Sequence, residues 1–282
     1  MFKDKIRSRG NDITLFLGGG MGNVLFQINF AENLLSDGHK VAINSSLVTN
    51  KYLLKLINWT HHQNTLNNLR EICALPAGRY EEQKTPTRLL GFLPLISKLS
   101  KFENLKHSCP DDVELLNGVF GYFQNKSELN FKFVQRIKTG INDYCIRRNL
   151  VLASSDELVI HFRGGDYNLN SEFKQPSNFF EAQRELFEDF DKITIITNDV
   201  DKAVLNYSKL ADRSKLTFKS SENSIDDFCY IASSKNLVIS NSTFSWWASE
   251  LSEAKIIYQP KVFFPHLRNW EPGTLKTRVS VY

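Results

Sequence analysis

An α/β fold with parallel sheets is predicted for this chain of 282 residues, because short apolar runs alternate with stretches of helical spacing. In the second half, apolar runs of strand length occupy residues 158–161, 192–197, 216–218, 237–239 and 256–258. Polar or glycine-rich residues follow several of these runs. Ligands of parallel α/β sheets bind at the carboxyl ends of strands, so these tracts are the candidate functional sites.

The first half contains the same kinds of element. Strands are predicted at residues 14–17 and 40–43, and helices at about 24–35 and 142–151. Ser154-Ser155-Asp156 reads as a linker turn after the last of these helices. We therefore predict an N-terminal lobe at residues 1–152 and a C-terminal lobe at residues 153–282.

Helices fill the intervals between the strands of the second half. They are predicted at residues 178–187, 201–210, 225–233 and 246–252. Ser177 is the expected N-cap of the first of them. The apolar run at residues 256–258 is the last predicted strand.

The composition is typical of a globular protein of ordinary polarity. A net charge of +4 argues against a nucleic-acid partner and fits an anionic nucleotide sugar or an acidic membrane surface. The four cysteines have no paired spacing, which predicts free thiols in a reducing compartment. No secretory signal or bilayer-spanning segment is evident, so we expect a cytoplasmic location.

A polar tract at residues 240–247, Ser-Asn-Ser-Thr-Phe-Ser-Trp-Trp, joins a strand to the next predicted helix. The first N–H groups of a helix lack internal partners and carry partial positive charge, so such a place binds phosphate. The alternative is a cluster of N-cap residues followed by two core tryptophans. The candidate ligand-binding residues are Asn241, Ser242, Thr243, Phe244 and Ser245.

A second tract follows the strand at residues 158–161. His161 and Arg163 are two positions apart, so they point to the same face of a strand. Gly164 and Gly165 allow a sharp turn, and the planar guanidinium of Arg163 suits an oxyanion. The alternative is a structural ion pair between Arg163 and Asp166.

A third tract, Gly-Gly-Gly-Met-Gly-Asn at residues 18–23, lies between the first strand and the first helix. It does not fit the dinucleotide-binding fingerprint, because the third glycine position falls on Asn23 or Leu25. It is not a phosphate loop of nucleoside triphosphatases either, because no Gly-Lys-Ser/Thr follows.

Together these tracts resemble the α-1,2-fucosyltransferases of glycosyltransferase family 11. The family's Gly-Gly-Leu-Gly-Asn-Gln-Met-Phe-Gln corresponds to residues 19–27, and its His-x-Arg-Arg-Gly-Asp-Tyr to residues 161–167. Its Asn-Ser-Thr-Phe-Ser-Trp-Trp is unchanged at residues 241–247. Similar segments also occur in the family's order at residues 121–124, 195–199 and 260–264. Val24 and Gly164 depart from the family, which has Gln and a second Arg at these positions.

The resemblance implies a glycosyltransferase of the GT-B type with two Rossmann-like lobes, an acceptor-side N-terminal lobe and a C-terminal lobe that binds GDP-fucose. The implied reaction moves L-fucose from GDP-fucose to the 2-hydroxyl of a galactose in a glycan acceptor, with inversion and without a cofactor. By analogy, the acceptor is a lipid-linked surface polysaccharide. At the glycine turn, the implied substrate-binding residues are Gly20, Gly22, Asn23 and Gln27.

In this reaction GDP departs with developing negative charge, so electrostatic stabilisation of the diphosphate is the main expected contribution. We assign it to Arg163, with His161 beside it. Asn198 and Asp199 end the strand at residues 192–197, and either they bind guanine or ribose or Asp199 caps the next helix.

The catalytic base is less well determined by the sequence. Asp166 and Glu172 are candidates, and Asp166 acts either as a base or only as a support for Arg163. The Asp-x-Asp spacing of metal-dependent transferases occurs twice. Residues 189–191 lie before a strand, away from the expected site, whereas residues 199–201 lie at the carboxyl end of a strand, where both acids also suit a helix start. Arg163 and helix dipoles can carry the charge, so we expect no metal and activity that survives chelation.

Two further features have alternative interpretations. If the family's second Arg does not contact substrate, Gly164→Arg should have a modest effect, whereas Arg163→Ala should abolish transfer. The basic and apolar segment at residues 84–98 fits peripheral contact with anionic lipid or a buried loop, and Pro94 argues against one continuous helix. Other function classes are a non-catalytic GDP-sugar or carbohydrate-binding relative and a nicotinamide-dependent oxidoreductase, which the missing glycine fingerprint disfavours.

Overall fold

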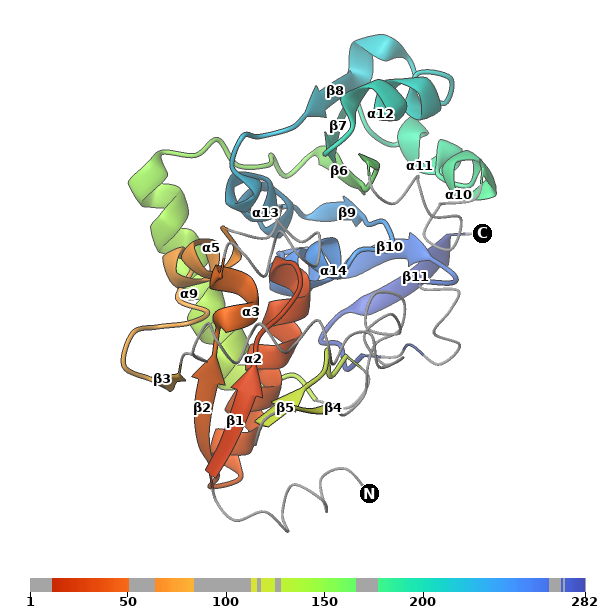
Figure 1. Cartoon of the computed structure of the whole chain (residues 1–282). Helices are drawn as coiled ribbons and strands as arrows, with labels where there is room; N and C mark the ends of the chain where they lie inside the picture. The colour runs from red at the N-terminus through yellow and green to blue at the C-terminus, as the bar shows by residue number, and fades with distance from the viewer. Residues whose placement is uncertain are drawn as a thin grey trace. The chain divides into compact units, whose positions relative to one another are not determined.

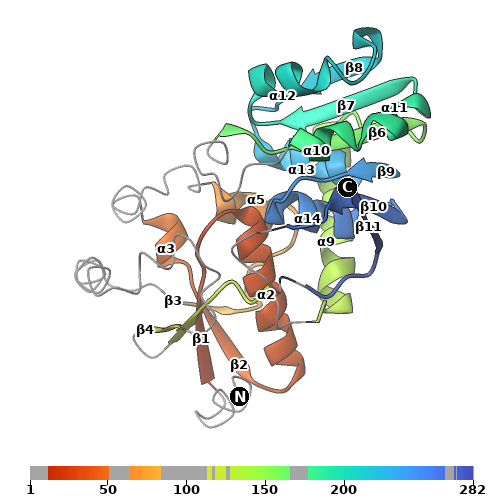
Figure 2. The same cartoon turned by 90° about the vertical axis from the view of Figure 1, so that its right-hand side faces the viewer.

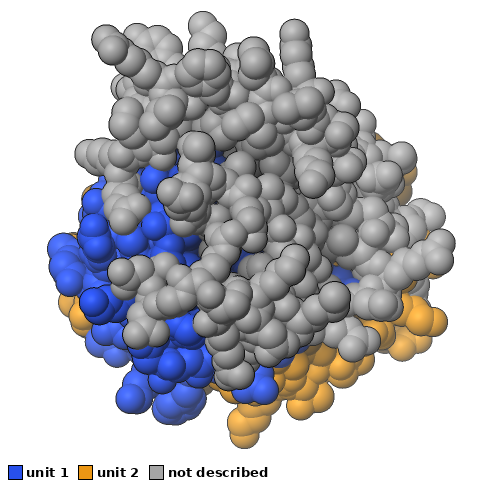
Figure 3. All heavy atoms as spheres, turned by 60° about the horizontal axis from the view of Figure 1, so that its bottom comes forward, with its two compact units in different colours: residues 1–141, 269–273 blue, residues 142–268, 274–282 orange. Residues whose placement is uncertain are grey.

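The computed structural model describes residues 12–50, 64–83, 113–115, 118–124, 128–165, 177–263, 270 and 272–281. The chain forms two compact units, which Figure 3 distinguishes by colour. The first contains Met1–Ile141 and Asn269–Gly273, and the second contains Asn142–Arg268 and Thr274–Tyr282. The division falls inside helix α9, Phe131–Arg148, whereas we predicted a boundary at residue 152.

The first unit has a five-stranded sheet in the order β3-β2-β1-β5-β4, in which only β4 runs antiparallel to its neighbour. The strands are β1 Asp12–Phe16, β2 Lys40–Asn44, β3 Glu81–Gln83, β4 Val113–Leu115 and β5 Gly118–Phe120. The helices are α2 Met21–Ser36, α3 Ser46–Thr49 and α5 Thr65–Glu71. Helix α2 begins directly after the glycine turn and packs on β2 (Figure 1).

Helix α2 is buried on nearly every side. Its Glu32 carboxylate is neutralised by residues from later in the chain. Arg79 donates two hydrogen bonds of 2.8 and 2.6 Å to Glu32, Arg136 donates one of 2.5 Å, and the Tyr80 hydroxyl donates another. Burial alone would raise the pKa of Glu32, but these hydrogen bonds outweigh it and lower the pKa to about 2. The cluster fixes the helix that carries Asn23 and Gln27.

The second unit has a six-stranded, all-parallel sheet in the order β11-β10-β9-β6-β7-β8 (Figure 2). The strands are β6 Glu157–Phe162, β7 Lys192–Thr197, β8 Leu216–Lys219, β9 Asn236–Val238, β10 Ile256–Pro260 and β11 Thr277–Val281. The helices are α10 Ser177–Glu181, α11 Arg184–Glu188, α12 Val200–Tyr207, α13 Ser224–Ala232 and α14 Thr243–Leu251, with a short 3-10 helix at Arg213–Lys215. Strand β6 is central and every one of its residues is buried.

The predicted fold class is confirmed: the chain has two α/β units, each with a Rossmann-like sheet whose strands are all or mostly parallel. Three details differ from the prediction. The helix predicted at residues 178–187 is two short helices, because Gln183 is buried and bonds to the Phe179 carbonyl at 2.9 Å where the chain turns. Helix α9 starts at Phe131 rather than at residue 142, and β11 is an additional strand after the predicted last one.

Candidate functional site

Two of the predicted tracts meet at the carboxyl edge of the second sheet, because β9, β6 and β7 are adjacent and parallel. His161, at the end of β6, is joined to Ser240, which follows β9, by a 2.8 Å contact between Nδ1 and the hydroxyl oxygen. The residues after β7 bond to the loop after β6. The prediction that these tracts lie at the carboxyl ends of parallel strands is therefore confirmed.

His161 is a neutral group in this site. It is 5% exposed, and burial, helped by the charge of Arg163, lowers its pKa to about 3. Its ring lies 5.8 Å from that of Phe244, centroid to centroid. A neutral imidazole cannot supply positive charge to a diphosphate at neutral pH, so among these two residues only Arg163 can do so.

The loop that carries Arg163 is held by two side chains from the end of β7. The Gly164 N–H donates to Asn198 Oδ1 at 2.9 Å, and the Gly165 N–H donates to Asp199 Oδ2 at 3.0 Å. Asp199 is also the N-cap of α12, since its Oδ1 accepts from the Lys202 N–H at 3.2 Å. The Gly165 bond is the main cause of the lowered pKa of Asp199. Asn198 and Asp199 thus fix the Arg163 loop.

Gly164 has no room for a side chain, which argues against the modest effect expected of Gly164→Arg. A Cβ at this position would overlap the Cβ of Asp199 and lie 3.0 Å from its Cγ and Oδ2. Asp199 cannot swing away without giving up its bonds to Gly165 and α12. The glycine is therefore a packing requirement of this loop.

We expect Gly164→Ala to lower the free energy of unfolding by about 1–3 kcal/mol, because overpacking forces neighbouring atoms apart. Thermal and urea unfolding measure this loss. The matched background is Asp199→Gly, which removes the atom that the new Cβ would meet. In the Asp199→Gly background, Gly164→Ala should lower the free energy of unfolding by less than it does in the wild type. Equal costs in both backgrounds would show that crowding against Asp199 is not the cause.

Helix α14 starts earlier than predicted, at Thr243, so the hydroxyl-bearing residues lie in its N-cap and first turn. Ser242 is the N-cap, and its side chain makes no capping hydrogen bond to the helix. The buried Ser245 hydroxyl donates to the Ser242 carbonyl at 3.1 Å, which supports the turn from inside. Asn241 is also buried, whereas Thr243 and Phe244 are half-buried.

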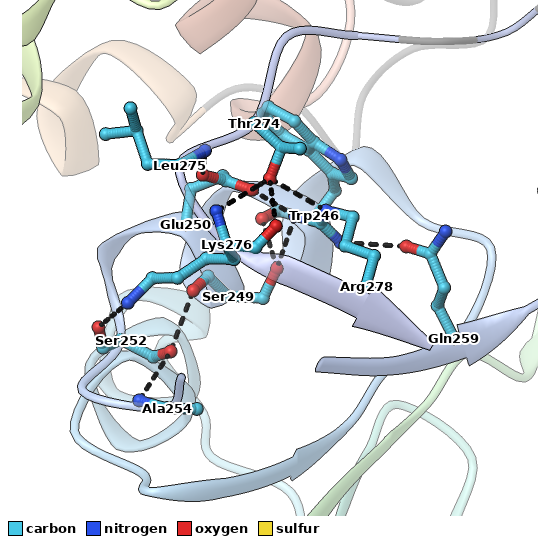
Figure 4. A network of polar contacts seen from close by, with 10 residues as sticks. All are labelled: Trp246, Ser249, Glu250, Ser252, Ala254, Gln259, Thr274, Leu275, Lys276 and Arg278. Atoms are coloured by element: carbon cyan, nitrogen blue, oxygen red, sulfur yellow. Dashed lines mark hydrogen bonds and ion pairs between the residues drawn. The ribbon is translucent and has the colours of Figure 1, made fainter. Parts of the chain in front are cut away.

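The remainder of α14 is anchored to the final strand (Figure 4). Trp246 and Trp247 are fully buried, and the guanidinium of Arg278 in β11 lies 5.0 Å from the Trp246 ring centroid. Arg278 also forms an ion pair with the fully buried Glu250, and the Leu275 N–H donates to Glu250 at 2.8 Å. No pattern in the sequence indicated that Leu275 and Arg278 would contact the helix that follows the polar tract at residues 240–247.

In the first unit, the glycine turn is fixed by Gln27 from α2. Its Oε1 accepts from the Gly18 N–H at 3.0 Å, and its Nε2 donates to the Gly121 carbonyl at 2.9 Å. Since β1 and β5 are neighbours, this bond ties the turn after β1 to the loop after β5. Gly20 is the N-cap of α2, and Gly22 lies in the first turn of that helix.

Asn23 has partners that were not among the predicted site residues. Gln124 Nε2 donates to Asn23 Oδ1 at 3.1 Å, and Trp270 Nε1 donates to Gln124 Oε1 at 2.5 Å. The family resemblance included the segment at residues 121–124, which could have pointed to Gln124. Nothing near Trp270 in the sequence indicated that it belongs to this unit.

Several predictions fall outside the described part of the chain: the candidate bases Asp166 and Glu172, Cys109, and the segment at residues 84–98. Where the structure is described, no three His, Cys, Asp or Glu side chains gather closely enough to hold a metal ion. Cys73, Cys145 and Cys229 are free thiols. No helix among the described residues has the length and apolar character needed to span a bilayer.

A family model and one relative agree with the motifs. A sequence model described as Glycosyl transferase family 11 matches residues 119–263, which include both polar tracts of the second unit. The O-antigen biosynthesis glycosyltransferase WbnK of Escherichia coli is 23% identical over 302 residues, covering 94% of this chain and 97% of WbnK. Among solved structures, E. coli heptosyltransferase WaaC with ADP is 11% identical with a TM-score of 0.48, covering 95% of this chain and 93% of WaaC. A glycosyl transferase family 9 protein from Veillonella parvula is 9% identical with a TM-score of 0.46, covering 96% of this chain and 86% of that protein.

Proposed function

Because this chain belongs to glycosyltransferase family 11, we propose that it transfers L-fucose from GDP-fucose to the 2-hydroxyl of a galactose, with inversion. The observation that carries the proposal is the 2.8 Å contact between His161 and Ser240, which joins the two most characteristic motifs at adjacent strand ends. The name of the E. coli relative, an O-antigen biosynthesis glycosyltransferase, supports an acceptor in a surface polysaccharide. We propose that this acceptor is lipid-linked.

In the proposed reaction, the second unit binds GDP-fucose and the first unit, with Gly20, Gly22, Asn23 and Gln27, serves the acceptor side. Arg163 neutralises the charge that develops on the β-phosphate as the bond to fucose breaks. The N–H groups of the first turn of α14, together with Asn241, Ser242 and Thr243, add donors to the diphosphate or ribose.

The remaining residues have supporting roles in this proposal. Neutral His161 orients the Ser240 turn, and Phe244 packs against His161 and against Phe228, whose ring centroid is 5.1 Å away. Ser245 holds the turn through the backbone. Asn198 and Asp199 set the position of Arg163 and lie at the edge where guanine or ribose would bind. Asp166 or Glu172 takes the proton from the acceptor hydroxyl.

The test is incubation with GDP-fucose and a panel of β-galactosides, followed by mass spectrometry and linkage analysis. We expect a product heavier by one fucose, linked α-1,2, formed equally well in EDTA. A 2-deoxygalactoside is the matched control, because it lacks the proposed nucleophile and should give no product. GDP binding without turnover on any galactoside would instead identify a non-catalytic relative. Loss of turnover in EDTA, restored by magnesium or manganese, would contradict the metal-free mechanism.

A further inference from the structure

The side chains of Trp270, Gln124 and Asn23 form a chain of hydrogen bonds that ends at the glycine turn of the first unit. Trp270 Nε1 donates to Gln124 Oε1 at 2.5 Å, and Gln124 Nε2 donates to Asn23 Oδ1 at 3.1 Å. Asn23 lies over the turn, since a Cβ built on Gly19 would be 3.0 Å from Asn23 Nδ2. Asn269–Gly273 belongs to this unit although the chain on both sides belongs to the other.

The direction of these bonds is fixed by chemistry. An indole nitrogen can only donate a hydrogen bond, whereas a side-chain amide donates at one end and accepts at the other. The Trp270 N–H therefore requires the oxygen end of Gln124, which turns the Gln124 NH₂ toward the oxygen of Asn23. We infer that Trp270 is a positioning residue that directs the NH₂ end of Asn23, rather than its oxygen, to the glycine turn.

The backbone next to Gln124 supports this inference independently. Phe123 has a φ of 49°, although it is neither Gly nor Asn. A bulky residue adopts this left-handed conformation only where the surrounding structure over-determines it, and such strain clusters at functional sites. Phe123 is fully buried and stacks on Phe30 with ring centroids 4.2 Å apart. The strained backbone of Phe123 thus lies directly before Gln124 and sets the direction of its side chain.

The turn itself is fixed separately from the amide of Asn23. Gln27 binds the Gly18 N–H and the Gly121 carbonyl, so the backbone of the turn does not depend on Trp270. Gly19 has a φ of 87°, which a side chain would disfavour. Loss of the Trp270 N–H should therefore reorient Asn23 while the turn stays in place.

In a complex with substrate, the Asn23 NH₂ would donate to an oxygen of the ligand. With the ligand taken from the proposed function, that oxygen belongs either to the diphosphate of GDP-fucose or to a hydroxyl of the acceptor sugar. Kinetics of the Trp270→Phe variant distinguish the two sources, because each predicts a change in a different Michaelis constant. A change in the KM for GDP-fucose identifies the first, and a change in the KM for the galactoside identifies the second.

The decisive experiment is a double-mutant cycle between Trp270→Phe and Asn23→Ala, read as kcat/KM for fucosyl transfer. Trp270→Phe keeps an aromatic ring but removes the donor, and we expect a loss of about 10- to 100-fold, typical of residues that orient a site group. In the Asn23→Ala background the same change should cost less than about twofold, because its effect passes through Asn23. Gln124→Glu, which keeps an oxygen for Trp270 but removes the NH₂, should match Trp270→Phe.

Independent losses that multiply in the double variant would overturn the inference, as would full activity of Trp270→Phe. A readout without turnover separates this failure from failure of the proposed function. In a ¹⁵N–¹H spectrum, the indole resonance absent from Trp270→Phe should move upfield in Gln124→Leu, which removes the acceptor, and stay downfield in Gln124→Glu, whose carboxylate oxygen still accepts the bond. An indole resonance unmoved by Gln124→Leu would refute the relay even if the protein transfers fucose. The expected shifts without any fucosyl transfer would leave the relay supported and reject only the reaction.

Discussion

Arg163→Ala is expected to lower kcat/KM for fucosyl transfer by about 100- to 1,000-fold, the loss typical when one preorganised group is removed from a developing negative charge. Of His161 and Arg163, only Arg163 is positively charged near neutral pH, since burial keeps His161 neutral with a pKa of about 3. No change in protonation of His161 can replace the guanidinium near neutral pH. Steady-state kinetics with GDP-fucose as the varied substrate measures the loss.

The fold should survive this substitution, because the loop is held by its backbone. The Gly164 and Gly165 N–H groups bond to Asn198 and Asp199, and neither bond involves the Arg163 side chain. The melting temperature of Arg163→Ala should therefore stay near that of the wild type. Arg163→Lys should recover only part of the activity, since an ammonium cannot grip two phosphate oxygens in a planar fork.

Arg184→Ala is the matched control for Arg163→Ala. It removes an arginine from the same unit, on α11, whose side chain is 53% exposed and paired with Glu181 on the surface. Its kinetics should be unchanged, because exposed ion pairs contribute little and this one lies in no predicted tract. A kcat/KM of Arg163→Ala within about threefold of the control would remove Arg163 from the proposed mechanism.

Much of the second unit could be predicted from the sequence because its central strands, β6, β7 and β9, are largely buried. Such strands appear as continuous apolar runs, and β7 was predicted with the bounds that it has, residues 192–197. The meeting of His161 with Ser240 followed from the rule that parallel strands present their carboxyl ends at one edge. Where strands are uniformly buried, the apolar pattern and the sheet topology were enough to predict both the strands and the candidate site at their ends.

The sequence was least informative where a side chain depends on a distant partner. The buried Gln183 interrupts a helix that apolar spacing made continuous, since its amide needs a backbone acceptor. Strand β11 is mostly exposed and lacks an apolar run, so periodicity did not find it. Trp270 reaches Gln124 only through the return of the chain to the first unit. Contacts of this kind have no local signature.

The ion pair between Glu250 and Arg278 is another long-range contact, and breaking it should have the largest effect on stability. We expect Glu250→Ala to lower the free energy of unfolding of the second unit by about 3–5 kcal/mol, because it leaves a buried guanidinium without its counter-charge. Arg278 already has a lowered pKa from burial, which the charge of Glu250 opposes. Urea unfolding followed by tryptophan fluorescence measures the change, since Trp246 is buried against Arg278.

Glu253→Ala provides the matched control, at a residue that lies just after the end of the same helix. Glu253 pairs with Lys235 at 3.7 Å, but the two side chains are 67% and 53% exposed, so the loss should be below about 1 kcal/mol. Equal stability of Glu250→Ala and Glu253→Ala would show that the buried pair contributes no more than a surface one. A double variant, Glu250→Leu with Arg278→Met, should be more stable than Glu250→Ala, because it leaves no unpaired charge inside.

The same pair should influence ligand binding through α14. Arg278 holds Trp246 by stacking and Glu250 by charge, so it fixes the helix whose first turn contains Ser242 and Thr243. Glu250→Ala should therefore weaken GDP binding in calorimetry under conditions where the variant is still folded, whereas Glu253→Ala should not. The double apolar variant separates the two roles of the pair. If it regains stability but not GDP affinity, the charges serve mainly to orient α14, and if it regains both, packing alone is sufficient.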